Sequence, residues 1–146
     1  MSVTIEYGGH TVWPCVSFLL IRDNSVLLET RSLDKESDPG LIAVPGGHME
    51  PGEDQAASLA RELDEELGVQ AVEPLYLCSL FHPAQHELQW IHYYVVTQWH
   101  GEIGSHEAAS VDFYPLDEPL PIQVESDAVA VAEWLRLRDQ IVTDKS

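Results

Sequence analysis

Three glutamates lie close together in one stretch of the sequence and could bind a divalent cation. Glu65 and Glu66 follow Glu62 by three and four residues, and residues with this spacing are neighbours on one face of an α-helix. Crowded carboxylates repel one another by roughly 0.2–0.5 kcal/mol per pair in an isolated helix. A divalent cation would reverse the sign of that interaction, and hard oxygen ligands without a thiolate suit Mg²⁺ or Mn²⁺.

The residues before these glutamates could bring backbone close to a phosphate. The glycines of segment 45–47 (PGG) can approach a ligand closely and can adopt a positive φ, and segment 51–52 (PG) forms a turn. Glu53 follows this turn, and Arg61 lies about two helical turns later, where it could orient a carboxylate. Phosphoryl chemistry needs this combination, because the backbone contacts phosphates, carboxylates hold metal and a rigid helix fixes both.

A helix must hold these groups, and the sequence predicts one over residues 53–67. Asp54 lies in its first turn and Gly68 just past its end, which matches the polarity of helix termini. At about 100° per residue, one apolar stripe can face the core. That stripe consists of Ala56, Ala60, Leu63 and Leu67.

The rest of the chain predicts a mixed sheet with helices packed against it. Strand-like segments cover 3–7, 16–21, 26–28, 42–44, 75–81, 90–99 and 111–114, and residues 32–40 form a loop. A last helix begins at Ser126 as its N-cap. Its buried face is predicted to carry Ala128, Val131 and Leu135. The order strands, helix, strands, helix favours an α/β architecture.

The segment 47–69 resembles the Nudix box, G-x5-E-x7-R-E-U-x-E-E-x-G-U, in which U is a bulky apolar residue. A complete match of this length is specific, whereas a lone glycine-rich loop would be weak. The resemblance implies a Nudix-type α/β/α sandwich, with a mixed β-sheet flanked by the box helix and a C-terminal helix, as a single domain over residues 1–146. Every specified position is occupied, by Gly47, Glu53, Arg61, Glu62, Leu63, Glu65, Glu66, Gly68 and Val69.

The resemblance also implies a mechanism. Nudix hydrolases cut a nucleoside diphosphate linked to a further group by attack of water on phosphorus. Bound metal ions, here Mg²⁺ or Mn²⁺, neutralise charge on the phosphates and lower the pKa of the attacking water. The implied metal-binding residues are Gly47, Glu62, Glu65 and Glu66, and the implied catalytic residues are Glu53, Arg61, Glu62 and Glu65.

The general base lies outside the box in some members of this family. Glu107 is the candidate here, because it precedes a segment, SVDFYPLDE, that is similar to the one following the distal acid of MutT-like proteins. Glu102 is the alternative, and an ordinary surface acid is an equal reading of Glu107.

Four residues are candidates for substrate binding. Arg31 ends a predicted strand and either contacts a substrate phosphate, as an arginine there does in similar proteins, or forms a surface ion pair. Gly46 and Gly47 would contact the substrate through their backbone, and His48 either reaches the substrate or only lines the loop.

Other polar and aromatic residues carry weaker signals. His82 and His86 are four residues apart, but Pro83 between them argues against a helical metal pair. Phe81, Trp90 and Tyr94 could stack on a nucleobase, although aromatic residues in strands more often pack on one another.

Composition excludes several classes of partner. The chain has 25 Asp and Glu against 7 Lys and Arg, a formal charge of −18, and it lacks the basic cluster that binds nucleic acid polymers or anionic membrane. A small nucleotide could still bind through metal cations. Free thiols at Cys15 and Cys78 favour a reducing cytoplasm, and no signal peptide or membrane helix is expected.

The sequence leaves three functions to compare. The first is a pyrophosphohydrolase of nucleoside di- or triphosphates that clears the nucleotide pool, with oxidised dGTP as one substrate among several. The second is an ADP-ribose or nucleotide-sugar hydrolase. The third is a non-catalytic nucleotide-binding Nudix module, against which the intact box argues. Monomer and homodimer both remain open.

Overall fold

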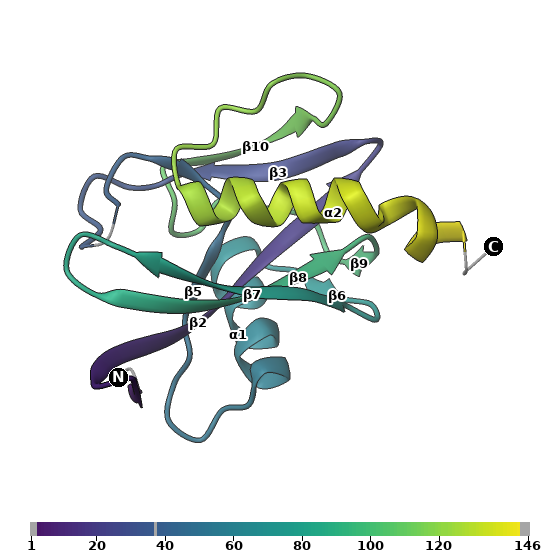
Figure 1. Ribbon diagram of the computed structural model, residues 1–146. Coiled ribbons are helices and arrows are strands. Elements are labelled where there is room, and N and C mark those ends of the chain that lie inside the picture. The colour runs from purple at the N-terminus through teal and green to yellow at the C-terminus, as the bar shows by residue number, and fades with distance from the viewer. Residues whose placement is uncertain (1–2, 37, 144–146) are drawn as a thin grey trace.

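The computed structural model describes residues 3–36 and 38–143, and shows a mixed sheet between two helices (Figure 1). Residues 1–2, 37 and 144–146 of the predicted domain lie outside the described residues. The order of elements agrees with the prediction. The elements are β1 (Ile5–Tyr7), β2 (His10–Arg22), β3 (Ser25–Thr30), β4 (Ile42–Ala43), β5 (Gly46–His48), α1 (Gln55–Leu67), β6 (Gln70–Ala71), β7 (Leu75–Pro83), β8 (Leu88–Val96), β9 (Trp99–His100), β10 (Ser110–Pro115) and α2 (Glu125–Thr143).

The long strand β2 organises the sheet. The strand order is β10-β3-β2-β8-β7, with β2 and β8 parallel and the other neighbours antiparallel. The short strand β5 pairs with the middle of β2, with Gly47 opposite Val16. This pairing holds the segment before α1 against the centre of the sheet and so fixes where α1 begins.

Both faces of the sheet are buried, which explains the continuous apolar run in β2. Successive side chains of a strand point to opposite faces. Phe18 and Leu20 therefore join a core cluster with α1, whereas Cys15 and Leu19 join a second cluster with α2. The predicted α/β/α sandwich is confirmed, with the box helix and the C-terminal helix on opposite faces.

Helix α1 begins later and faces the sheet differently than predicted. Asp54 is its N-cap and accepts a hydrogen bond from the amide of Ala57 at 2.8 Å, and Gly68 ends it at a φ of 74°. The predicted stripe is wrong at Ala56 and Ala60, which are exposed. Burial stabilises a leucine side chain by roughly 1.5–3 kcal/mol, which is more than the smaller alanine side chain gains, so the helix buries its leucines. The buried residues are Ser58, Leu59, Glu62, Leu63, Glu66 and Leu67.

Two further predictions need correction. Ser126 is not an N-cap, because α2 already begins at Glu125 and the Ser126 hydroxyl bonds to that of Tyr93 at 3.1 Å. Of the predicted buried face of α2, Val131 is buried, but Ala128 is exposed because the helix turns Asp127 and Trp134 inward instead.

The segment 45–47 is also not a free loop. Its two glycines belong to strand β5, and neither has a positive φ. The predicted strand 90–99 ends at Val96, and Trp99 starts β9, which pairs with β6. No helix among the described residues is both long and apolar enough to cross a membrane.

Candidate active site

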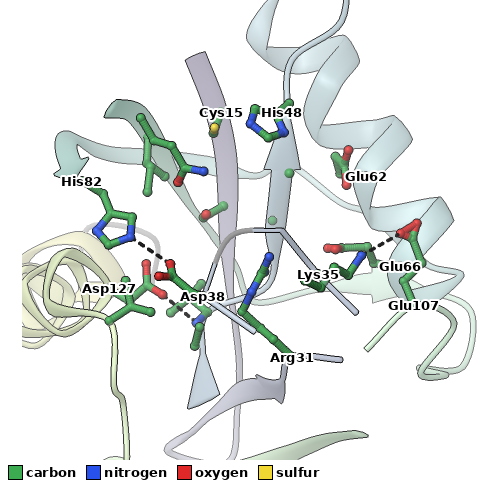
Figure 2. Close-up of a pocket in the computed structure, with 18 of the residues that line it drawn as sticks. Cys15, Arg31, Lys35, Asp38, His48, Glu62, Glu66, His82, Glu107 and Asp127 are labelled. Carbon is green, nitrogen blue, oxygen red and sulfur yellow. Dashed lines mark hydrogen bonds and ion pairs between the residues drawn. The ribbon is translucent and has the colours of Figure 1, made fainter. Parts of the chain in front are cut away.

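A cavity of about 400 Å³ opens where β5, α1, the 32–41 loop and the start of α2 meet (Figure 2). Its described lining contains nine Asp and Glu residues against three Lys and Arg. Glu62, Glu66 and Glu107 lie on one side of the view in Figure 2, with Asp38 and Asp127 on the other. One acidic pocket therefore brings together Gly47, Arg61, Glu62, Glu65, Glu66 and Glu107.

Gly47 is required by the carboxylate behind it. A Cβ at this position would lie 2.5 Å from the carboxylate carbon and oxygens of Glu62. Gly47 therefore allows a close approach to the Glu62 carboxylate through its absent side chain and not through a positive φ.

Arg61 links the segment before α1 to the helix itself. Its guanidinium donates to both carboxylate oxygens of Glu53, at 2.7 and 3.0 Å, and to the backbone carbonyl of His48 at 2.9 Å. It also donates to Glu62 at 2.8 Å and Glu65 at 3.1 Å. A planar guanidinium with this many acceptors fixes their relative positions.

Glu53 is the main anchor of Arg61. Its Oε1 also accepts from the amide of Glu50 at 2.9 Å and from the hydroxyl of Ser58 at 2.5 Å. The hydrogen bond from Arg61 is the largest cause that lowers the pKa of Glu53 to about 2. Glu53 therefore stays ionised and supports the site without facing it.

Two carboxylates of α1 are buried without enough compensating charge. Glu62 and Glu66 are each 7% exposed, and burial raises the pKa of both. The charge of Glu29, followed by those of Glu62 and Glu107, raises the pKa of Glu66 further. Oε2 of Glu66 is buried without a hydrogen-bond partner, and a buried, unpaired carboxylate oxygen is expensive.

This donor set fits a hard divalent cation. The orphaned oxygen of Glu66 and its repulsion by neighbouring acids are what a cation would relieve. Among the described side chains, no three His, Cys, Asp or Glu residues converge closely enough to hold an ion. The guanidinium of Arg61 forms ion pairs with the carboxylates of Glu62 and Glu65. Glu62, Glu65 and Glu66 would hold the ion, which requires Glu65, an exposed side chain, to turn from Arg61.

The distal candidates separate clearly. Glu107 lines the pocket with its side chain 37% exposed, and its Oε2 lies 4.0 Å from Nζ of Lys35. Glu102 is exposed and does not line the pocket, so it is not placed to act there.

Arg31 and His48 also reach the pocket. Arg31 points into it and donates to Glu29 at 3.0 Å. Nε2 of His48 lies 2.5 Å from Oε2 of Glu87, which also accepts from Gln89 at 2.7 Å. Gly46 lines the pocket beside them, and a Cβ there would overlap the backbone of β2.

The weaker candidates form no second site among the described residues. His82 lines the same pocket and bonds Asp38 at 2.9 Å, while His86 is exposed. Phe81 and Trp90 stack on each other at 5.8 Å and do not line the pocket. The hydroxyl of Tyr94 donates to Gln55 at 2.6 Å, also outside the pocket. Phe81, Trp90 and Tyr94 therefore contact other residues of the protein, as the packing alternative predicted, and do not face the pocket.

Sequence reasoning missed Asp127. This residue in the first turn of α2 is 3% exposed and lines the pocket. Its carboxylate accepts from the amide of Val44 at 2.9 Å and the hydroxyl of Tyr93 at 2.6 Å. Burial raises its pKa to about 6. An acid in a first helical turn is explained by the helix dipole alone, so no local signal marked it.

Sequence reasoning also missed Glu29, Lys35, Asp38 and Glu87. Glu29 left a faint signal, since it is an acid continuing the apolar segment 26–28. Lys35 and Asp38 belong to a polar loop, and Glu87 to a turn, where charged residues are ordinary.

Comparisons with known proteins agree with this geometry. The family model described as the NUDIX domain matches residues 12–135. CTP pyrophosphohydrolase of Escherichia coli (strain K12) is 31% identical over 105 residues, covering 72% of this chain and 77% of that protein. 8-oxo-dGTP diphosphatase of Proteus vulgaris is 29% identical over 82 residues, covering 56% and 72%.

The fold has solved counterparts. The crystal structure of a MutT NUDIX hydrolase from Burkholderia pseudomallei has a TM-score of 0.75 at 23% identity, covering 84% of this chain and 97% of that one. The family model, covering most of the chain, and the carboxylate-lined pocket lead to one conclusion. The chain belongs to the Nudix family and is a hydrolase that acts on phosphorus-containing anhydrides.

Proposed function

We propose that the protein is a Mg²⁺-dependent pyrophosphohydrolase of nucleoside triphosphates, with Mn²⁺ as an alternative ion. The observation that carries this proposal is the buried, unpartnered oxygen of Glu66 beside the Glu62 carboxylate, which a divalent cation would satisfy. The acidic lining adds a reason for metal dependence, because a polyphosphate would be repelled without cations. Two relatives bear names of nucleoside triphosphate hydrolases.

The proposed mechanism assigns each group a task. When bound by Glu62, Glu65, Glu66 and the Gly47 carbonyl, the metal supplies charge neutralisation and lowers the pKa of water. Arg61 holds the Glu62 carboxylate in place through its hydrogen bond, while Glu53 anchors the guanidinium.

The remaining groups act on the substrate and on the attacking water. Arg31 and His48 bind phosphate oxygens, and the backbone at Gly46 and Gly47 lets the phosphates approach. Glu107, at the open edge of the pocket, accepts the proton of the attacking water at a carboxylate oxygen. The nucleoside would then lie at the far end of the pocket, on the side of Asp38 and Asp127.

A substrate panel with Mg²⁺, with products identified by mass, tests the proposal. Pyrophosphate plus a nucleoside monophosphate from a triphosphate supports it. AMP plus a sugar phosphate from ADP-ribose or a nucleotide sugar would replace it with the second function. Tight nucleotide binding without turnover of any diphosphate would indicate a non-catalytic module. EDTA should abolish turnover, and Glu66→Gln should lower kcat by about 10²-fold or more.

We further propose a cytoplasmic location and action on small nucleotides. The free thiols Cys15 and Cys78 suit a reducing compartment. Recovery of the protein in a secreted fraction would contradict this. The strong negative charge disfavours nucleic acid polymers, which an electrophoretic mobility assay with DNA and RNA would check.

A further inference from the structure

We propose that Glu29, which lies outside the Nudix box, is a positioning residue that holds the Arg31 guanidinium in place for the substrate phosphates. The inference rests on the proposed function, in which Arg31 contacts those phosphates. It adds to the site a buried residue, Glu29, that does not contact the substrate and acts through Arg31.

The geometry of β3 places the two side chains together. Glu29 lies in β3 and Arg31 directly follows its last residue, so the two side chains, two residues apart, point to the same side. Nη1 of Arg31 lies 3.0 Å from Oε2 of Glu29. The Glu29 side chain is 4% exposed, and the Arg31 side chain is 19% exposed and lines the pocket. Across the ladder, Glu29 pairs with Ala43, whose small side chain leaves room for the carboxylate.

Arg31 lies at a central position in the pocket. Figure 2 shows its side chain rising between Asp38 and Asp127 on one side and Glu66 with Glu107 on the other. A polyphosphate that joins a metal at Glu66 to a nucleoside near Asp127 would pass this guanidinium. Its orientation therefore matters to binding along the whole substrate.

The burial of Glu29 is costly, which argues that the carboxylate has a role. Burial is the largest cause that raises its pKa to about 7, while the charge and hydrogen bond of Arg31 act in the opposite direction. A buried ion pair can often be replaced by apolar residues without loss of stability. Removal of one member alone is destabilising, because it leaves a buried charge without a partner. Stability alone therefore does not account for the pair.

Positioning explains the pair better than metal binding does. A divalent cation at Oε2 of Glu29 would have to lie beside the guanidinium at 3.0 Å, and like charges repel. An arginine fixed before the substrate arrives loses less conformational entropy on binding. The expected consequence of losing Glu29 is weaker substrate binding with unchanged chemistry.

A double-mutant cycle with Glu29→Gln, Arg31→Gln and the double variant tests this at saturating Mg²⁺. Glu29→Gln should raise KM about tenfold and leave kcat within about twofold, since one charge-assisted hydrogen bond is lost. Arg31→Gln should raise KM by at least as much. The double variant should match Arg31→Gln, because Glu29 acts only through Arg31.

The controls separate positioning from folding. Glu133→Gln removes one member of an exposed ion pair on α2, with 2.8 Å between Arg136 and Glu133, and should leave KM unchanged. Melting temperatures of all variants show whether they fold. If Arg31→Gln does not fold because Glu29 is left unpaired, Arg31→Lys replaces it, since lysine keeps the charge and loses the planar fork.

Three outcomes would overturn the inference. KM effects that add in the double variant would show that Glu29 acts independently of Arg31. A fall in kcat with a higher Mg²⁺ requirement in Glu29→Gln would make Glu29 part of the metal site. A normal KM in Glu29→Gln beside a raised KM in Arg31→Gln would overturn the inference alone, whereas a wild-type protein that hydrolyses no triphosphate would overturn the proposed function.

Discussion

Replacing Gly47 by alanine should disable the site while leaving the fold intact. The added Cβ would lie 2.5 Å from the Glu62 carboxylate, whereas ordinary contacts measure 3.4–4 Å. The carboxylate must therefore move by about 1 Å, a displacement that can lower a rate by about 10²-fold. Strand β5 cannot yield as easily, because Gly47 is paired with Val16 in the middle of β2.

The assay is steady-state hydrolysis of a nucleoside triphosphate across a Mg²⁺ titration, together with thermal unfolding. We expect kcat to fall by about 10²-fold, the Mg²⁺ requirement to rise, and the free energy of unfolding to change by less than about 1 kcal/mol. A folded Gly47→Ala protein with wild-type kcat and Mg²⁺ dependence would refute the reasoning, because Glu62 could then move without consequence.

Two other glycines provide matched comparisons. At Gly46 the added Cβ would overlap the backbone carbonyl of Val16 and the hydroxyl of Ser17, so Gly46→Ala should destabilise the fold itself. At Gly8 the added Cβ meets no atom within 4 Å, although φ is 56°. Gly8→Ala should therefore lower stability slightly through backbone strain and leave kcat unchanged.

Three further predictions concern charge. Glu66→Gln should raise the melting temperature in EDTA, because it removes a buried carboxylate whose pKa is raised by burial; an unchanged or lower value in thermal unfolding would contradict this. Mg²⁺ at about 100 times its Kd should stabilise the wild type by roughly 2.7 kcal/mol, and an equal gain in Glu66→Gln would show that the ion binds elsewhere. Burial raises the pKa of Asp127 from 3.8 to about 6, so the folded state binds the proton of this carboxyl more tightly than the unfolded state does. The stabilisation of the fold by this proton is fully present below about pH 4 and is lost as the pH rises through 6. The unfolding free energy of Asp127→Asn should therefore gain about 3 kcal/mol on the wild type across that window, and denaturant titrations that show a constant difference would count against it.

Local patterns in the sequence were sufficient to predict that the box segment forms a helix and that its three glutamates lie close together on it. The spacing of Glu62, Glu65 and Glu66 places them on adjoining turns wherever the helix packs. Gly68 ends the helix with a backbone conformation that glycine adopts readily. The central strand segment 16–21 followed from its run of apolar residues, because a strand buried on both faces must be apolar throughout.

Packing decided the features that local patterns could not reach. Which side of α1 is buried depends on how the helix packs on the sheet. Leu59, Leu63 and Glu66 face the sheet and are buried, whereas Ala56 and Ala60 are exposed. Packing also explains why segment 46–48 forms strand β5 and not a free loop, because Gly47 pairs with Val16, 31 positions earlier in the chain.

The sequence by itself determined the reaction class, because the box carboxylates and the helix ends depend on neighbours within a few positions. Only the tertiary structure decided how the pocket is completed. Asp127 reaches the amide of Val44 across 83 residues, and Glu29 becomes a buried partner of Arg31 only when β3 is covered by its neighbours. The Asp127 contact joins residues far apart in the chain, and the burial of Glu29 depends on neighbouring strands, so both depend on the packing of the whole sheet and not on a local pattern.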